Sequence, residues 1–446
     1  MYVEVFAVLV AVCGVCMVVQ NRLEKASHQD GGSAVSSMVE DGGTPNTIAV
    51  QKGQRDSFSR FQLSYLVVYY LAVSSDWLQG PYVYALYSDY GYDKQAIGQL
   101  FIAGFGSSAL FGTFVAAVAD KFGRKSNVIV FCVTYALSCV TKHSPNFWVL
   151  MIGRVLGGIA TSILFSAFEA WLVSEHHSRN YPGPWLSETF AKAQFGNGVV
   201  AIVSGQLAGQ AANTFGKVAP FDMSLVVLVL CGLLVSWMWS ENYGDERQSV
   251  GAGLGNAWNI MLRDRRILMI GLIQSCFEGA MYTFVFVWTP AMQARSGDVE
   301  IPHGMIFSSF MVCMMIGSSL FTVLVSKFAI EKFLRVCIVL ALGVFVNAIA
   351  LNSLIGVYGS FLAFEVICGI YFPSFGTLRS RYIPEEVRSA IMNFFRLPLN
   401  IIVVAMMYRD LDMTTIFSIS ASLMLISLVG LQVLIHSPSI AHADLK

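Results

Sequence analysis

Long apolar runs alternate with short polar segments along almost the whole chain. Thirteen of these runs are close to the roughly 20 residues that an α-helix needs to cross the hydrocarbon core of a bilayer. A membrane β-barrel would instead show alternating segments of about ten residues, so the continuous runs predict an all-α membrane protein. The runs lie near residues 1–20, 62–88, 95–119, 126–142, 147–173, 189–212, 221–240, 267–291, 304–326, 333–352, 357–380, 389–408 and 414–436.

A polar interval separates the first run from the other twelve. Residues 21–60 are rich in glycine, serine and charge, which is typical of a flexible linker. Glu4 precedes the first run and Arg22 and Lys25 follow it, the reverse of the basic start of a cleaved signal peptide. We therefore expect an uncleaved transmembrane helix over residues 1–20 with its N-terminus outside; a signal peptide is the alternative.

Lysine and arginine are distributed unevenly over the loops. If residues 21–60 are cytoplasmic, 20 basic residues fall in inside loops or termini and only 5 in outside loops. This is the positive-inside pattern of membrane proteins. It favours a multi-pass membrane protein with its N-terminus outside and its C-terminus in the cytoplasm.

The later twelve runs divide into two sets of six. A longer polar connection separates the sets, and short similar segments recur in both at an offset of about 200–210 residues. Such an internal duplication is typical of secondary transporters. We expect six-helix bundles over residues 61–243 and 267–440, joined by a cytoplasmic loop over residues 244–266.

The amino-acid composition excludes several classes of protein. The chain has 446 residues, 55% of them hydrophobic and only 13% charged, and its net charge is zero. These values exclude a disordered chain and a strong positive field for nucleic acid. The nine cysteines lie inside apolar runs, and we find no nucleotide loop, nucleophile triad or metal-ligand spacing. We therefore expect neither an enzyme nor a cofactor, and the partners expected are a solute and the lipid bilayer.

Three motifs resemble those of the major facilitator superfamily. Asp-Lys-Phe-Gly-Arg-Lys at residues 120–125 resembles its signature loop between core helices two and three, although Ala116 stands where the family has glycine. Residues 154–158 resemble its second motif, in core helix four, and residues 383–388 resemble the start of helix eleven. The resemblance implies the major facilitator fold, two six-helix bundles plus one extra N-terminal transmembrane helix.

The signature loop also implies a function for its charges. By this resemblance Asp120, Arg124 and Lys125 form a cytoplasmic latch that holds the two bundles together in one state. A solvated positive-inside loop is the alternative.

Longer stretches, from about residue 58 to 436, are similar to one branch of that superfamily, the molybdate-anion transporters. This resemblance implies uptake of the oxyanion MoO₄²⁻ into the cell by alternating access. A carrier of another solute (sulfate, a sugar or an organic ion) and a non-transporting receptor or scaffold are the alternatives. The similar stretches are residues 72–82, 164–171, 306–310, 368–374 and 393–398.

Seven ionisable residues stand out at membrane depth in the predicted runs, away from the outermost few residues of each run, where a charge is costly unless it faces water or a partner. They are Asp76, Arg154, Glu169, Lys192, Glu278, Glu365 and Arg396. A tetrahedral dianion needs several convergent donors, and a guanidinium supplies two at once. We therefore expect Arg396 to bind the anion, with Asn393 one turn away on the same face.

The other candidates are assigned less specific roles. Lys192, in the counterpart helix of the first half, is the expected second cation, with Asn197 close by, and Tyr82 is a further candidate ligand. For Arg396 and Lys192 the alternative is an ion pair that only fixes packing. The remaining charges are expected to form cavity ion pairs or to carry a co-transported proton: Asp76, Arg154, Glu169, Glu278 and Glu365.

Overall fold

The computed structural model describes residues 1–36, 45–243, 250–297, 299–408 and 411–437, and the regular elements of these residues are all helices. In chain order they are α1 (Tyr2–Ser36), α2 (Pro45–Gln79), the 3₁₀-helix η1 (Gly80–Tyr82), α3 (Val83–Asp89), α4 (Lys94–Phe122), α5 (Arg124–Val140), the 3₁₀-helix η2 (Thr141–His143), α6 (Phe147–Leu164), α7 (Ala167–Ser178), α8 (Gly183–Phe215), α9 (Ala219–Met238), α10 (Val250–Arg263), α11 (Arg265–Ser296), α12 (His303–Val325), α13 (Ile330–Ala350), α14 (Leu354–Tyr382), α15 (Glu385–Tyr408) and α16 (Met413–His436).

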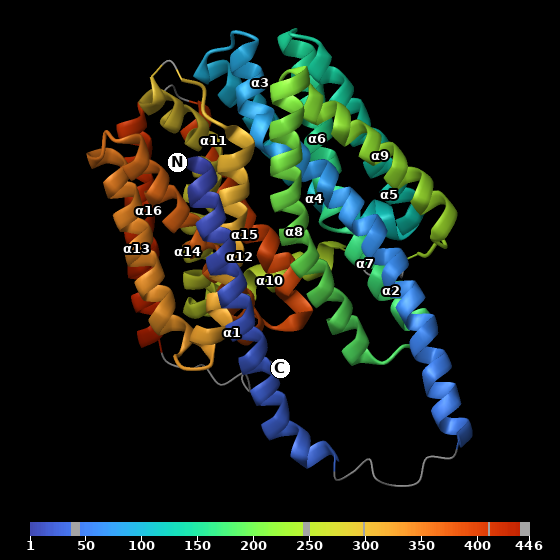
Figure 1. The fold of residues 1–446 in the computed structure, drawn as a ribbon. Coiled ribbons are helices and arrows are strands. Elements are labelled where there is room, and N and C mark those ends of the chain that lie inside the picture. Colours follow the sequence, from blue (N-terminus) through green and yellow to red (C-terminus); the bar gives the residue numbers. More distant parts are fainter. Residues whose placement is uncertain (37–44, 244–249, 298, 409–410, 438–446) are drawn as a thin grey trace.

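The helices gather in two groups that lie side by side (Figure 1). Helices α2–α9 pack on one another to form the first bundle, and α11–α16 form the second. The bundles meet mainly at two helix pairs, α8 with α12 and α4 with α15, and less extensively where η1 packs on α12 and α3 on α11. The short α10 packs against α15 and α11. The all-helical expectation is confirmed, whereas the bundle boundaries at 61–243, 244–266 and 267–440 stay predictions.

The first predicted run of the first bundle is broken in the structure. Proline has no N–H to donate to a preceding helical turn, and Pro81 ends α2 in the tight turn of η1. The run expected over residues 62–88 is therefore two helices, α2 and α3.

The N-terminal helix is longer than the first apolar run. α1 continues to Ser36 and α2 begins at Pro45, so the helices extend into the interval 21–60 from both sides. That this interval serves as a flexible cytoplasmic linker stays a prediction. Arg, Leu, Glu, Lys and Ala follow residue 21, and their high helix propensity extends the helix beyond its apolar part.

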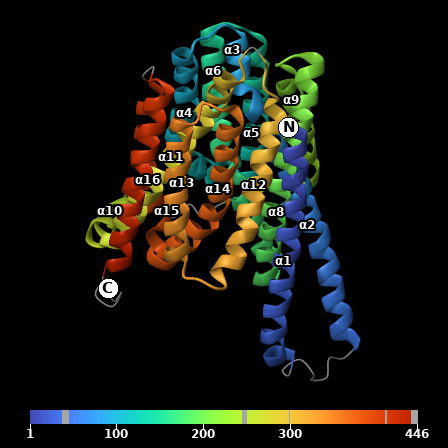
Figure 2. The same ribbon diagram turned by 60° about the vertical axis from the view of Figure 1, so that its left-hand side comes forward.

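α1 lies along α12 in both views (Figures 1 and 2). Cys13 packs with Val312 and Ile316, and the ring of Tyr2 meets Tyr358 edge-on at 5.2 Å between centroids. The opposite face exposes a row of valines, as a lipid-facing helix does. Within the described residues, eight helical segments are long and apolar enough to cross a membrane, and residues 2–22 are one of them. That α1 crosses the membrane stays a prediction.

The bundles touch closely at the end of the molecule where α3 lies, which we call the α3 end (upper in Figure 1). A Cβ atom on Gly304 of α12 would lie 2.3 Å from the carbonyl oxygen of Gly205 on α8, and one on Gly98 of α4 would lie 2.4 Å from that of Met407 on α15. Real Cβ atoms do not approach so closely, so both helix pairs depend on glycine to meet backbone to backbone.

An ion-pair cluster also links the bundles at the α3 end. Lys217 Nζ lies 2.9 Å from Asp89 in the first bundle and 3.0 Å from Glu300, in the connection between α11 and α12. The ring of Tyr82 lies 5.5 Å from that of His303 beside them. The α3 end is therefore closed by backbone packing, aromatic contact and opposite charge.

A second lysine at this end is buried. Lys142 in η2 is 1% exposed, with its Nζ 3.4 Å from Thr141 Oγ1 and 5.8 Å from the centroid of the Tyr87 ring. Burial, together with the positive charge of Arg154, lowers the pKa of Lys142 from 10.5 to about 7.

This pKa predicts how stability depends on pH. The unfolded chain keeps Lys142 protonated up to its ordinary pKa, whereas the folded protein releases the proton above about 7. The free energy of unfolding should therefore rise with pH from about 7 to 10.5. We expect Lys142→Met to raise the melting temperature of the detergent-solubilised protein at pH 7, by roughly 2–4 °C per kcal/mol of penalty removed, and to flatten its rise with pH. Lys327→Met is the control, because Lys327 is exposed. If Lys142→Met lowers the melting temperature more than Lys327→Met does, the folded protein stabilises the charged form of Lys142 and the prediction is wrong.

Candidate functional site

Arg396 of α15 reaches from the second bundle to the first. A Cβ atom built on Gly112 of α4 would lie 4.0 Å from Arg396 Nη1 and 3.6 Å from Ser162 Oγ of α6. A guanidinium from one bundle and a hydroxyl from the other therefore flank the same small space. That space is open because Gly112 has no side chain. Arg396 itself is exposed, so its guanidinium is accessible to a ligand.

A short series of serines continues from this space into the first bundle. Ser108 Oγ lies 3.1 Å from Ser162 Oγ, and Ser166 Oγ donates to the carbonyl oxygen of Ser162 at 2.8 Å. Ser162 and Ser166 are one helical turn apart, where the fourth core helix breaks between α6 and α7. A hydroxyl can rotate to donate to a ligand, so these serines are candidate ligands that the sequence analysis missed.

The second bundle surrounds Arg396 with further charges. Glu278 of α11 accepts hydrogen bonds from Tyr371 Oη and from Gln274 Nε2, each at 3.4 Å. Arg379 of α14 donates to Gln274 Oε1, also at 3.4 Å. Both Arg379 and Arg396 act electrostatically on the Glu278 carboxylate. The second bundle therefore presents two cations and one anion, and Arg379 is a member that the sequence analysis did not single out.

Two other predicted charges lie within the first bundle. Asp76 of α2 accepts a hydrogen bond from Tyr135 Oη of α5. Arg154 of α6 donates through Nε to the carbonyl oxygen of Leu100 at 3.2 Å, lies over the ring of Phe101 at 4.9 Å and acts electrostatically on Asp76. Asp76 and Arg154 are thus close enough to interact, and their function in a cavity ion pair or a proton path stays a prediction.

The predicted second cation, Lys192, has its own partners. Its Nζ lies 2.9 Å from Glu188 Oε1 and 2.7 Å from Gln62 Oε1. The pair with Glu188 lies within α8, one helical turn apart, so it is not the interhelical ion pair that would only fix packing, and that alternative stays a prediction. Asn197 accepts a hydrogen bond from Trp77 Nε1 at 2.8 Å, and Tyr82 is buried at the closed α3 end. Anion binding by these three residues stays a prediction.

Of the remaining candidates, Glu365 is the most deeply buried. It is 6% exposed, and its Oε2 has no hydrogen-bond partner among the described residues. Glu169 is exposed. Asn393 lies on α15 and Asp120 on α4, but their side chains are outside the described part of the structure.

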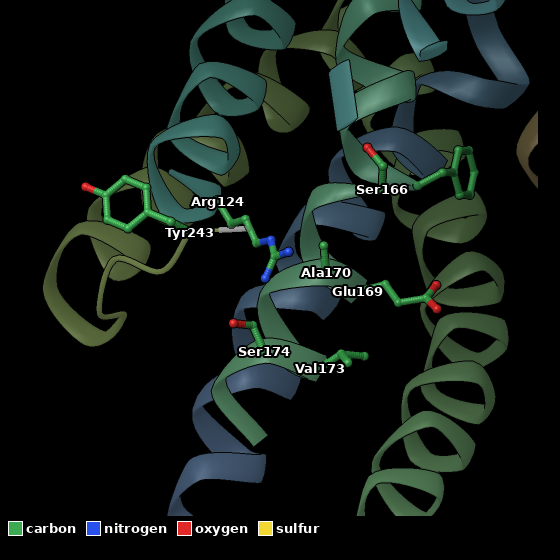
Figure 3. A pocket seen from close by; sticks show the side chains of 8 residues that line it. Arg124, Ser166, Glu169, Ala170, Val173, Ser174 and Tyr243 are labelled. Carbon is green, nitrogen blue, oxygen red and sulfur yellow. The ribbon is translucent and has the colours of Figure 1, made fainter. Parts of the chain in front are cut away.

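A cavity of about 720 Å³ opens along α7 (Figure 3). Ser166 belongs both to its lining and to the serine series, whereas Arg396 and Ser162 are not among the residues that line the cavity. The guanidinium of Arg124 points toward α7, whereas Glu169 projects from the other side of that helix (Figure 3). The lining residues are Arg124, Phe165, Ser166, Glu169, Ala170, Val173, Ser174 and Tyr243.

The predicted latch residues contact the end of their own bundle. The backbone N–H of Arg124 donates to the carbonyl oxygen of Asn242 at 2.9 Å. Glu241 Oε1 accepts from the backbone N–H of Lys125 at 2.8 Å, and Lys125 Nζ donates to the carbonyl oxygen of Ser236 at 3.0 Å. A latch between the two bundles stays a prediction.

Comparison with known proteins places the chain among transporters. A family model, MFS_5, described as sugar transporters with 12 transmembrane segments, matches residues 1–370. Proteins named molybdate-anion transporter are 37% identical over 361 residues in Xenopus tropicalis and 34% identical over 380 residues in Takifugu rubripes, covering 78% of each chain in both cases.

Solved structures have the same fold. The nucleoside transporter NupG superposes with a TM-score of 0.66 at 12% identity, over 84% of this chain and 99% of that one. An auto-inhibited peptide transporter of the POT family superposes with a TM-score of 0.68 at 9% identity, over 86% and 98% of the two chains.

Proposed function

The chain belongs to the MFS_5 family of the major facilitator superfamily, a multi-pass membrane transporter and not an enzyme, and from that premise we propose that it carries the molybdate dianion into the cell. Its relatives named molybdate-anion transporter support this substrate. The two bundles would expose the site around Arg396 to each side of the membrane in turn.

The observation that carries this proposal is the position of Arg396. A guanidinium offers two parallel donors that match an oxyanion, and Arg396 Nη1 lies 4.0 Å from the point that a Cβ atom on Gly112 would occupy, which is 3.6 Å from Ser162 Oγ of the other bundle. A ligand held there would bind both bundles at once. Binding of the ligand would therefore be coupled to the relative movement of the two bundles that exposes the site to each side of the membrane.

A sugar carrier is the second candidate, because the family model is described in those terms. Sugars are neutral and are bound by hydrogen bonds that need no cation. Arg396 is a cation on a membrane-spanning helix, and such a charge is costly unless it faces water or has an anionic partner. The charges therefore favour the oxyanion.

The proposed topology places the α3 end outside the cell. In that orientation the contacts at Gly205, Gly304 and Lys217 close the outer side. The cavity that begins at Ser166 would then open toward the cytoplasm. We therefore interpret the structure as the state that releases substrate inward across the cell membrane.

Uptake by the purified protein in liposomes tests the proposal. We expect radiolabelled molybdate to accumulate inside, sulfate to compete more weakly, and a panel of neutral sugars not to compete. Saturable uptake of a sugar with no molybdate uptake would overturn the proposal in favour of the second candidate. An absence of flux for every solute would favour a receptor or scaffold.

The serine series predicts a smaller effect on affinity. Ser162→Ala removes one hydroxyl next to Arg396 and should raise the KM for molybdate by roughly 5- to 10-fold, since one hydrogen bond contributes about 1 kcal/mol. Ser418→Ala is the matched control, because Ser418 is exposed on α16 and bonds only its own helix, donating to Thr414 O at 2.7 Å. Equal KM values for the two variants would remove Ser162 from the site.

A further inference from the structure

We propose that the headgroup of an anionic, amine-free phospholipid binds in a second cavity, which lies on the first bundle at the end opposite α3. The cavity has a volume of about 350 Å³ and is lined by residues of α2, of α7 with its C-cap, and of the end of α9. None of these residues lines the larger cavity along α7. The inference goes beyond the proposed function and takes from it only the orientation that places this end at the cytoplasmic leaflet.

The cavity lies at the level where the apolar parts of two helices end. The apolar run of α2 begins near residue 62, next to Phe61, and α9 ends at Met238; both residues line the cavity. Phe61 and Trp171 are buried in its wall, and the indole of Trp171 stacks on that of Trp239 at 3.8 Å between centroids. Aromatic rings of membrane proteins gather at the level of the lipid headgroups. A ligand in this cavity would therefore lie at the depth of the phospholipid phosphates.

Two arginines bring positive charge to the cavity. Arg60 of α2 is exposed and has no hydrogen bond or ion pair with any other residue in the described part of the chain. Arg179 is held in place, because Glu175 Oε1 accepts from its Nε at 3.0 Å and from its Nη2 at 2.7 Å, and its guanidinium lies over the ring of Phe61 at 4.9 Å. Glu175 offsets the charge of Arg179. Arg60 therefore leaves the cavity with one net positive charge, which matches an anion of single charge.

Hydroxyl groups add further donors beside Arg60. Ser64 lies one turn further along α2 and lines the cavity. A helical serine commonly bonds the carbonyl oxygen of the preceding turn, but the hydroxyl of Ser64 has no hydrogen bond to the residues that the structure describes. Ser57 Oγ, one turn before Phe61, lies 2.9 Å from Tyr181 Oη. A free guanidinium and a free hydroxyl thus line one cavity, where a phosphate can accept from both.

The lining also selects against headgroups that carry an amine. No carboxylate belongs to the residues that line the cavity, all of which lie in the described ranges. The neighbouring Glu175 is already engaged by Arg179 and by Ser240, whose Oγ donates to it at 2.9 Å. An ammonium group would therefore meet cations without an acceptor for its own charge. The cavity favours a headgroup such as inositol or glycerol, which has hydroxyl groups and no amine.

Binding of short-chain lipids to the purified full-length protein in detergent tests this site. Dioctanoyl phosphatidylinositol should bind saturably and raise the melting temperature, whereas the phosphatidylserine analogue should bind more weakly and the phosphatidylcholine analogue least. Arg60→Gln should raise the Kd for phosphatidylinositol by roughly tenfold or more, because it removes a charge-assisted hydrogen bond. Arg335→Gln is the matched control, since Arg335 is exposed near the start of α13, at the same end of the molecule, and does not line the cavity.

A second pair of variants tests charge at constant size. Gly53 also lines the cavity, and a Cβ atom on it would meet nothing within 4 Å, so a side chain can be accommodated there. Gly53→Glu should weaken binding of phosphatidylinositol by repulsion, whereas Gly53→Gln should bind it like the wild type. Melting temperatures without lipid verify the fold of every variant.

Each contrary result would overturn the inference in a distinct way. Wild-type affinity in Arg60→Gln would show that the lipid binds elsewhere, and an equal loss in Arg335→Gln would show a general attraction to anionic lipid. Equal affinity for all three lipids would exclude recognition of the headgroup. If inorganic phosphate or glycerophosphoinositol, which has no acyl chains, binds as tightly as the lipid, the cavity takes a soluble phosphate. None of these results depends on molybdate uptake, so this inference and the proposed function fail independently.

Discussion

Replacement of Arg396 by alanine is expected to lower the kcat/KM of molybdate uptake by roughly a hundredfold or more. The variant loses the two donors that would face the oxyanion and leaves Glu278 with one fewer cation. Truncating one partner of a desolvated charge pair costs about 2–5 kcal/mol, and about 3 kcal/mol corresponds to a hundredfold. Arg396→Lys keeps the positive charge but lacks the planar guanidinium, so its kcat/KM should lie between those of the alanine variant and the wild type.

A neighbour on the same helix provides the control. Leu397 is 60% exposed on α15, so Leu397→Ala should transport molybdate like the wild type. Uptake is measured at equal amounts of reconstituted protein, with monodispersity verified for each variant. Wild-type kinetics in Arg396→Ala would show that the anion binds elsewhere, and the site described above would then be wrong.

Closure of the α3 end is expected to fail when Gly304 is replaced by leucine. A Cβ atom at this position would lie 2.3 Å from the carbonyl oxygen of Gly205 and 2.8 Å from Gly209 Cα. Backbone atoms of α8 cannot retreat without separating the two helices, so α8 and α12 would stay apart. We expect net uptake to fall at least about tenfold, which corresponds to a penalty of about 1.4 kcal/mol or more on the closed state.

Gly304→Leu should still bind molybdate from the outside. Binding is measured with the detergent-solubilised protein, and access to the α3 end with a cysteine introduced at Gly209 and a membrane-impermeant thiol reagent. Gly343→Leu is the matched control, because a Cβ atom on Gly343 of α13 meets nothing within 4 Å. Normal uptake with an inaccessible residue 209 in Gly304→Leu would show that the close helix contact is not required for closure.

Hydropathy and motifs predicted the fold more fully than the site. Apolar runs report helices directly, because each helix must be long and apolar enough to cross lipid, and the major facilitator fold is confirmed by structures that cover 84–86% of the chain. Local breaks and extensions of helices were harder to predict from the sequence. The interruption at Pro81 lies inside a continuous apolar run, and the helix beyond residue 20 lies inside a polar one.

Of the candidate site, only the charged residues could be singled out from the sequence, and their part in binding stays a prediction. Arg396 is conspicuous because a cation inside an apolar run is costly. Ser108, Gly112 and Ser162 are small residues common in membrane helices, and they approach Arg396 only because α4 and α15 pack together. No local periodicity encodes such a contact between helices of different bundles. The contact of Lys192, in contrast, lies within one helix: its partner Glu188 is one turn away and offsets its charge.

The ion pairs of Lys217 make the closed state of the α3 end sensitive to ionic strength. One ammonium group holds a carboxylate from each half of the molecule, and both acids are half-exposed to solvent. Exposed ion pairs weaken as ionic strength rises. In the orientation proposed above, a higher ionic strength outside the cell would therefore weaken this ion-pair cluster and favour the state that is open at the α3 end.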